Sequence, residues 1–136
     1  MSTRLHLIKL AVGPSSLEDL RDWQTKNVRK KELIHITRNF PKRAQEILNG
    51  GSIYWVIKGV IVGRNPILDL RRMMYGDQPH CGIIYSPELV RVSPKPRRPF
   101  QGWRYFENAD IPADLDEDAS QMSEEMLNAL DELGLL

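Results

Sequence analysis

The chain has 136 residues, of which 41% are hydrophobic and 27% charged, and this composition excludes a fibrous or wholly disordered protein. Its single cysteine, Cys81, excludes an internal disulfide framework. No apolar run approaches the roughly 20 residues that cross a bilayer, and the N-terminus lacks the pattern of a signal peptide. We therefore expect a cytoplasmic protein with no membrane partner.

The charges are divided unevenly along the chain. All 19 lysines and arginines lie between Arg4 and Arg104, where 8 acidic residues oppose them and leave a net charge of +11. The rest of the chain contains 10 acidic residues and no basic ones. This division predicts a basic α+β domain over residues 1–106, an acidic linker over residues 107–121 and a C-terminal amphipathic helix over residues 122–136.

The first third of the chain is predicted to alternate strands with a helix. Residues 5–12 form a short apolar run that a Gly-Pro pair ends, which predicts a strand followed by a turn. Ser16 and Asp19 have the spacing of a capping box, and the apolar residues after them recur at helical spacing, which predicts a helix. Residues 33–38 alternate in side-chain direction and predict a second strand.

The next helix is marked by a proline at one end and glycines at the other. Asn39 can cap a helix that begins near Pro41 and ends at Gly50. Residues 52–62 are rich in β-branched and aromatic side chains and predict one central strand, in which Gly59 marks a bulge.

Several short strands complete the predicted sheet. A turn at residues 63–66 leads into a strand at residues 67–70, and strands at residues 82–85 and 89–92 follow. Prolines exclude residues 93–100 from a central strand, because each proline removes a backbone donor. The expected fold class is therefore α+β, with a small mixed sheet that is curled or closed into a partial β-barrel, flanking helices and a C-terminal acidic helix.

The sequence lacks the local motifs of several common enzyme classes: there is no GxSxG elbow, phosphate-binding loop, dinucleotide fingerprint or HExxH zinc motif. His6, His35 and His80 are scattered, and Cys81 alone offers too few soft ligands for a structural zinc site. We expect no metal or cofactor, and a binding protein rather than an enzyme. A small enzyme with non-local catalytic groups, using His35 or Cys81, stays open as an alternative.

Basic and aromatic side chains alternate over residues 95–105, a mixture that neutralises phosphates and offers flat faces to nucleobases. Two more basic groups lie at the start of the predicted second helix, where free amides favour anions, and at the next hairpin. Lys58, in the predicted central strand, either blocks edge pairing or points at a ligand. We predict that the chain binds RNA, DNA or another polyanion through these residues: Lys42, Arg43, Lys58, Arg64, Arg97, Arg98, Trp103 and Arg104.

The acidic tail leads to a second functional hypothesis, a protein-interaction module. Met122, Met126, Leu130 and Leu133 form an apolar stripe, so the C-terminal helix either docks in a groove of a basic partner protein or folds back over the basic domain. In the second arrangement the tail competes with nucleic acid for the same surface.

Three runs of sequence resemble an uncharacterised family of short bacterial proteins, a domain of unknown function. They are residues 41–44 (PKRA), residues 50–60 (GGSIYWVIKGV) and residues 97–105 (RRPFQGWRY), and the resemblance covers about residues 5–106. More loosely, a helix that ends in glycine and leads into a long strand of a small mixed sheet is similar to the PUA-like superfamily. That resemblance implies a cleft for RNA or modified bases, although the related ASCH domains favour a Gly-x-Lys motif that this chain lacks.

Overall fold

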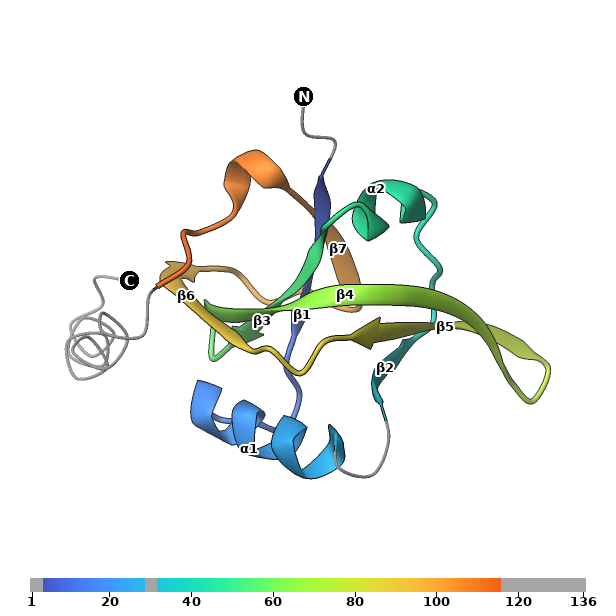
Figure 1. Cartoon of the computed structure of the whole chain (residues 1–136), viewed down its shortest axis with the longest axis horizontal. Coiled ribbons are helices and arrows are strands. Elements are labelled where there is room, and N and C mark those ends of the chain that lie inside the picture. The colour runs from blue at the N-terminus through green and yellow to red at the C-terminus, as the bar shows by residue number, and fades with distance from the viewer. Residues whose placement is uncertain (1–3, 29–31, 116–136) are drawn as a thin grey trace.

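Figure 1 shows the computed structural model of the chain, in which residues 4–28 and 32–115 are described. The expected helix at residues 122–136 lies outside the described residues, as does part of the expected linker. The elements are, in order, β1 (Leu5–Leu10), α1 (Leu17–Val28), β2 (Leu33–Thr37), α2 (Ala44–Leu48), β3 (Ser52–Ile57), β4 (Val60–Tyr75), β5 (Gln78–Tyr85), β6 (Val90–Pro96), β7 (Trp103–Glu107) and a 3₁₀ helix (Asn108–Asp110). In this described part of the chain, no helix has the length and apolar content needed to cross a membrane.

The strands form one sheet in the order β2-β5-β4-β3-β1-β7, and β6 pairs with β4 beside this path. β1 and β3 are parallel, whereas the other pairs are antiparallel. The 16-residue strand β4 pairs with β3 and β6 over its first part and with β5 from Ile67 onward. The register of this last pair shifts between Ile67 and Asp69, and the sheet curls (Figure 1), which confirms the predicted α+β fold with a mixed, curled sheet.

The single strand predicted at residues 52–62 is wrong, because the chain forms two strands there, β3 and β4, joined by a tight hairpin at Lys58 and Gly59. Both residues have positive φ, 51° and 78°, as a two-residue hairpin turn of this kind requires. Lys58 is therefore exposed at a turn instead of lying within a strand. The turn predicted at residues 63–66 is also wrong, because these residues continue β4 and pair with β3.

Gly63 is required by close packing rather than by a turn. A Cβ atom at this position would lie 2.6 Å from Leu17 Cδ1 of α1 and 3.2 Å from the carbonyl oxygen of Val90. The helix and the neighbouring chain thus approach β4 at its glycine. Pairing with β3 then overrides the turn tendency of the local sequence.

The helix expected from Pro41 is shorter than predicted. α2 begins at Ala44, and Arg43 rather than Asn39 occupies the N-cap position, without a side-chain cap. The backbone amide of Arg43 donates to the Tyr105 hydroxyl at 3.1 Å. It is therefore already paired and is not itself free to bind an anion.

Residues 103–107 form β7, a strand that the sequence analysis does not predict. It runs antiparallel to β1, with Leu5 opposite Glu107 and Lys9 opposite Trp103. Because β1 also pairs with β3, the first strand of the chain lies inside the sheet. The sheet has seven strands in the described part of the chain, one more than the sequence predicts.

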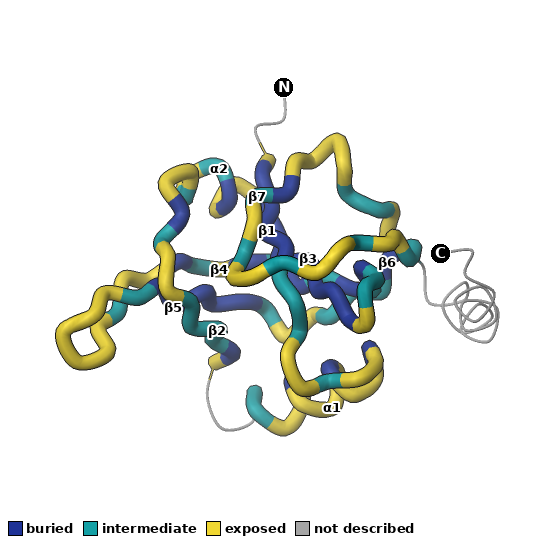
Figure 2. Tube along the Cα trace, turned by 180° about the vertical axis from the view of Figure 1, so that it is seen from behind, coloured by how far each residue is buried: buried dark blue, intermediate teal, exposed yellow. Residues whose placement is uncertain are grey.

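The curled sheet and α1 enclose the larger hydrophobic core, whose buried members include Leu20, Trp55 and Ile83. A smaller cluster around Ile8 and Tyr54 lies on the other face of β1 and β3. Figure 2 shows the buried strands in the middle of the molecule and the exposed hairpin between β4 and β5 projecting from it.

A buried hydrogen-bond network fixes α1 on the sheet. Gln24 of α1 and Asn65 of β4 exchange two amide hydrogen bonds of 2.9 Å each. Asn65 Oδ1 also accepts from Trp55 Nε1 at 2.8 Å, and its Nδ2 also donates to the Ser86 carbonyl at 2.9 Å. The fully buried Asn65 amide thus uses both of its donors and both of its acceptor positions.

Replacing Asn65 by leucine should lower the free energy of unfolding by about 3–5 kcal/mol, because Gln24, Trp55 and Ser86 would retain buried polar groups without partners. Urea denaturation followed by tryptophan fluorescence measures the change. Leu68→Ala, at an exposed position of β4, is the matched control and should change stability by less than about 0.5 kcal/mol. Equal effects of the two substitutions would contradict this role of Asn65.

Candidate functional site

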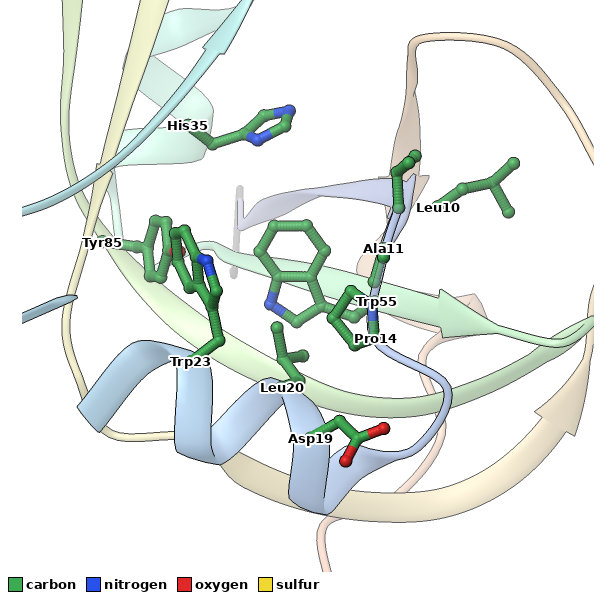
Figure 3. A pocket seen from close by; sticks show the side chains of 11 residues that line it. Leu10, Ala11, Pro14, Asp19, Leu20, Trp23, His35, Trp55 and Tyr85 are labelled. Atoms are coloured by element: carbon green, nitrogen blue, oxygen red, sulfur yellow. The ribbon is translucent and has the colours of Figure 1, made fainter. Parts of the chain in front are cut away.

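An open pocket lies between α1 and the curled sheet (Figure 3). Its volume is about 420 Å³, within the range of small-molecule sites. The walls come from the end of β1, the turn after it, α1, β2, β3 and β5, and consist of Leu10, Ala11, Val12, Gly13, Pro14, Asp19, Leu20, Trp23, His35, Trp55 and Tyr85. We call it the aromatic pocket, because four of these residues contribute rings.

Three of the rings are held in place by burial and by one another. Trp55 and Tyr85 are each 3% exposed, with ring centroids 5.9 Å apart and an interplanar angle of 68°. The His35 ring stands edge-on to Trp55 at 5.8 Å and 85°. Trp23, which is 47% exposed, rises from α1 as the fourth ring (Figure 3). Such walls accept a flat, mostly apolar group.

His35 lines the pocket and has a polar ring atom without a partner. Its Nε2 is buried and has no hydrogen-bond partner among the described residues. Burial, together with the smaller effect of the positive charge of Lys9, lowers the pKa of His35 to about 4. The imidazole is therefore neutral at pH 7, and a buried polar atom without a partner is unfavourable unless a ligand satisfies it.

Lys9 joins the pocket to the aromatic residues of β7. It lies between Trp55 of β3 and Trp103 of β7 in the sheet register, so the three side chains share one face. Burial lowers the pKa of Lys9. Trp103 packs edge-on against Tyr105 at 5.0 Å and donates from Nε1 to the Asn39 carbonyl at 2.9 Å. A row of aromatic and cationic side chains thus continues beyond the pocket.

Asp19 is the only carboxylate among the residues that line the aromatic pocket. Its Oδ2 accepts hydrogen bonds from the Ser15 hydroxyl at 2.6 Å and the Ser15 amide at 3.2 Å, which lower its pKa, and the nearby positive charge of Lys58 lowers it further. The Asp19 amide donates to Ser16 Oγ at 3.1 Å, which confirms the predicted N-terminal cap of α1. The rim of the pocket therefore carries a fixed negative charge close to a lysine.

Some of the cations predicted to bind a polyanion come together at the edge of the molecule. The amide of Arg97 donates to the Gly59 carbonyl at 2.8 Å, which brings the chain at Arg97 against the hairpin that carries Lys58. The guanidinium groups of Arg97 and Arg104 lie over the Phe100 ring, 5.2 and 5.6 Å from its centroid. Arg98 is exposed in the same segment, so it adds a fourth charge there.

The other predicted cations are placed elsewhere. Arg43 contacts Glu46 at 2.7 Å and Glu107 at 3.2 Å. Arg64 pairs with Asp114 on the outer face of the sheet. Lys42 is exposed beside α2. The structure therefore does not gather all eight predicted residues into one surface.

The aromatic pocket has no signature in the sequence. Trp23 has the spacing of a buried helix residue, and His35, Trp55 and Tyr85 each fall within predicted strands, where a core position is the ordinary interpretation. Only the curl of the sheet brings these strands opposite α1. The exposed fraction of Trp23 is the signal of a site, and it is visible only in the folded chain.

Cys81 is a core residue with no exposed surface, and burial raises the pKa of its thiol to about 11. A thiol with this pKa is protonated at pH 7, whereas a nucleophilic cysteine needs its thiolate. The alternative in which Cys81 acts as a catalytic nucleophile therefore loses support. Within residues 4–28 and 32–115, no group of three His, Cys, Asp or Glu side chains could hold a metal ion.

The chain belongs to the family described as "Protein of unknown function (DUF1489)", whose model matches residues 7–136. This confirms the predicted membership of an uncharacterised domain family. The match continues through the acidic tail, further than the resemblance predicted at about residues 5–106. No curated protein and no solved structure matches the chain, so the likeness to PUA-like domains stays a prediction.

His35 should make the native state sensitive to mild acid. Because its pKa is about 4 in the folded chain and 6.5 when unperturbed, the unfolded chain binds a proton between these values and the native chain does not. The free energy of unfolding should therefore fall as the pH falls from about 6.5 to about 4. Urea denaturation over this range measures the slope.

His35→Leu should make the dependence of the unfolding free energy on pH shallower. The pH dependence that is left comes from other groups such as His6, whose pKa is also lowered by burial. At about pH 7 the leucine variant should be at least as stable as the parent, because it removes a buried polar atom without a partner. An unchanged slope in His35→Leu would show that His35 titrates normally.

Proposed function

We propose that this member of the DUF1489 family binds single-stranded nucleic acid, with one unpaired base in the aromatic pocket and the adjoining phosphates against nearby cations. The observation that carries the proposal is the pocket itself: its walls are aromatic, and they include a neutral imidazole that has one buried nitrogen without a partner. A nucleobase has two flat apolar faces and a polar edge. The faces match the aromatic rings of the pocket, and the edge matches the imidazole of His35.

The aromatic walls account for affinity without sequence preference. Stacking of a base on one aromatic side chain contributes about 1–3 kcal/mol. Trp23 is the ring that a ligand can reach most easily, since Trp55 and Tyr85 are almost wholly buried. We therefore assign stacking to Trp23, and the floor of the pocket to Trp55 and Tyr85.

His35 supplies the polar contact. Its neutral ring carries one proton, so Nε2 donates or accepts according to the tautomer. A ligand edge that pairs with Nε2 would relieve the unfavourable burial of that atom. An uncharged heterocycle gains this contact without bringing a charge into a partly buried site.

Aromatic walls also suit quaternary ammonium groups, which bind over ring faces. Here, however, Lys9 and Lys58 lie close enough to lower the pKa values of His35 and Asp19, respectively. A cationic ligand would meet the repulsion of these two lysines and the attraction of one carboxylate, Asp19, so the positive charges outnumber the negative one. The same charges favour the phosphates of a polynucleotide.

The proposed ligand is single-stranded because the pocket lies between α1 and the sheet, and a base reaches such a site only after leaving its stack. Unstacking is least unfavourable when the base is not paired.

A second proposal concerns the acidic tail. We propose that it competes with nucleic acid for the basic surface or contacts a basic partner protein. This proposal rests on the separation of a net charge of +11 from one of −10 along the sequence. We place the function in the cytoplasm, where a free thiol such as Cys81 persists.

Trp23→Ala should weaken the binding of a short single-stranded oligonucleotide by about 5- to 150-fold, as expected for the loss of one stacked base. Fluorescence anisotropy of a labelled oligonucleotide at low salt measures the affinity. Tyr75→Ala is the matched control, since Tyr75 is an exposed aromatic residue of the projecting hairpin and is 55% exposed. It should leave the affinity unchanged.

His35→Leu should also weaken binding while the protein remains folded, and tetramethylammonium should not compete. The proposal fails if the parent protein binds no oligonucleotide at low salt, or if the Trp23 and Tyr75 variants lose affinity equally. Competition by tetramethylammonium would instead identify a cation-binding pocket.

Lys58→Asn should reduce the salt dependence of binding. Asparagine tolerates the left-handed conformation of this turn, so the hairpin keeps its shape. If Lys58 contacts one phosphate, the slope of log K against log salt should become shallower by about 0.7, the value for a single strand. Lys42→Asn, beside α2, tests whether Lys42 belongs to the same binding surface as Lys58. If the parent and Lys58→Asn have the same slope, Lys58 does not belong to the binding surface.

A further inference from the structure

A second hollow lies on the face of β3 and β4 opposite the aromatic pocket. Its volume is about 260 Å³, and it is lined by Arg4, His6, Ser52, Tyr54, Arg64 and Asp114, together with residues 111–113 and Gly50. Tyr54 and Arg64 are directly paired across the two strands. We call it the arginine hollow.

Arg64 is positioned as an anion-binding side chain. Its Nε and Nη2 donate to the two carboxylate oxygens of Asp114 at 2.8 and 2.6 Å. Its Nη1 donates to the Ser52 hydroxyl at 2.9 Å, which holds the guanidinium against β3. Only 22% of its side chain is exposed. A two-bond fork of this kind can bind a carboxylate or a phosphate.

The Asp114 carboxylate belongs to a short segment, residues 111–115, that runs beside β6. The amide of Ser93 donates to the Ala113 carbonyl at 2.8 Å, and the amide of Leu115 donates to the Arg91 carbonyl at 2.9 Å. A single bridge also joins Val92 to Asp114. The segment is thus attached by a few backbone hydrogen bonds and by the ion pair, a weaker attachment than a full strand.

The charges of Arg4, Arg64 and Asp114 all act on His6 in the hollow. His6 is buried, its Nδ1 accepts from the Ser52 amide at 3.0 Å and its Nε2 contacts Asn108 Oδ1 at 2.8 Å, so its proton lies on Nε2. Burial lowers the pKa of His6, and the charges of Arg4 and Arg64 lower it further. Two guanidinium groups therefore act on the neutral ring, against one carboxylate.

We propose that Arg64 and Arg4 form an oxyanion site, which the chain's own Asp114 occupies in this structure, and that a phosphate group displaces this carboxylate and releases residues 111–115 from β6. This inference does not rest on the proposed function, because the arginine hollow and the aromatic pocket lie on opposite faces of the sheet.

Phosphate is the favoured ligand because it offers more than Asp114 does. It presents three acceptor oxygens and up to two negative charges, whereas the carboxylate presents two oxygens and one charge. The additional oxygen can accept from the Ser52 hydroxyl. Burial raises the pKa of Tyr54 to about 12, so its hydroxyl is a neutral donor at the wall of the hollow.

Inorganic phosphate is the first probe, added to the full chain at constant ionic strength with chloride as the reference salt. Hydrogen exchange of the Ser93 and Leu115 amides reports release of the segment, and calorimetry reports affinity. Phosphate should speed exchange at both amides in the parent protein. Asp114→Asn should speed exchange roughly five-fold without phosphate and should bind phosphate more tightly, because the internal competitor has lost its charge.

Asp110→Asn is the matched control. It removes one nearby negative charge, yet the Asp110 backbone carbonyl that accepts from Lys95 is retained. It should behave as the parent does, and Arg64→Gln should abolish the phosphate effect. Equal phosphate affinity in the parent and Arg64→Gln, or equal behaviour of the Asp114 and Asp110 variants, would overturn the proposal.

Two further experiments distinguish inorganic phosphate from a nucleic-acid phosphate, and the arginine hollow from the aromatic pocket. A 5′-phosphorylated dinucleotide is compared with its unphosphorylated form, and an effect restricted to the first shows that the hollow also takes a nucleic-acid phosphate. Trp23→Ala should keep the response to inorganic phosphate whatever its effect on oligonucleotides. A loss of both responses in Trp23→Ala would contradict an independent site.

Discussion

The Asn65 side chain joins three elements at one point, and both candidate sites depend on its position. It holds α1 through Gln24 and orients the Trp55 indole, while its own strand carries Arg64 on the opposite face. Saturating a buried amide in this way fixes one arrangement, because any other would leave polar groups unpaired in the core. The rigid floor of the aromatic pocket follows from that single constraint.

The alternation of side chains along β3 and β4 divides the two sites. Trp55 and Asn65 face the core side, whereas Tyr54 and Arg64 face the arginine hollow, and each residue is the sequence neighbour of one on the other face. A shift of register by one residue would exchange these faces. The hairpin at Lys58 and Gly59 starts this pairing, and the register shift between Trp55 and Val56 moves it by one residue, so the turn and the shift together determine which side chains meet in each site.

The predicted elements were correct where the local pattern is strong and wrong where tertiary contacts override it. Apolar periodicity was enough for β1, α1 and β2. The residues at 63–66 have the composition of a turn, but pairing with β3 and the approach of Leu17 to Gly63 keep them in β4. The aromatic pocket has no local signal, since His35 and Tyr85 come from strands that meet only after the sheet curls. The contact between Arg64 and Asp114 spans 50 residues, beyond the reach of any pattern in the sequence.

The position of β1 between β3 and β7 has a consequence for the order of folding. Leu5 pairs with Glu107, so β1 is synthesised well before β7, which is its second neighbour in the sheet. Until then one edge of β1 presents unpaired backbone groups, the kind of edge that favours association with other chains. Closing a contact over this separation also slows folding relative to a fold built from local pairs. The time for which that edge of β1 stays open during synthesis therefore affects the chance of association, even though the finished sheet covers the edge.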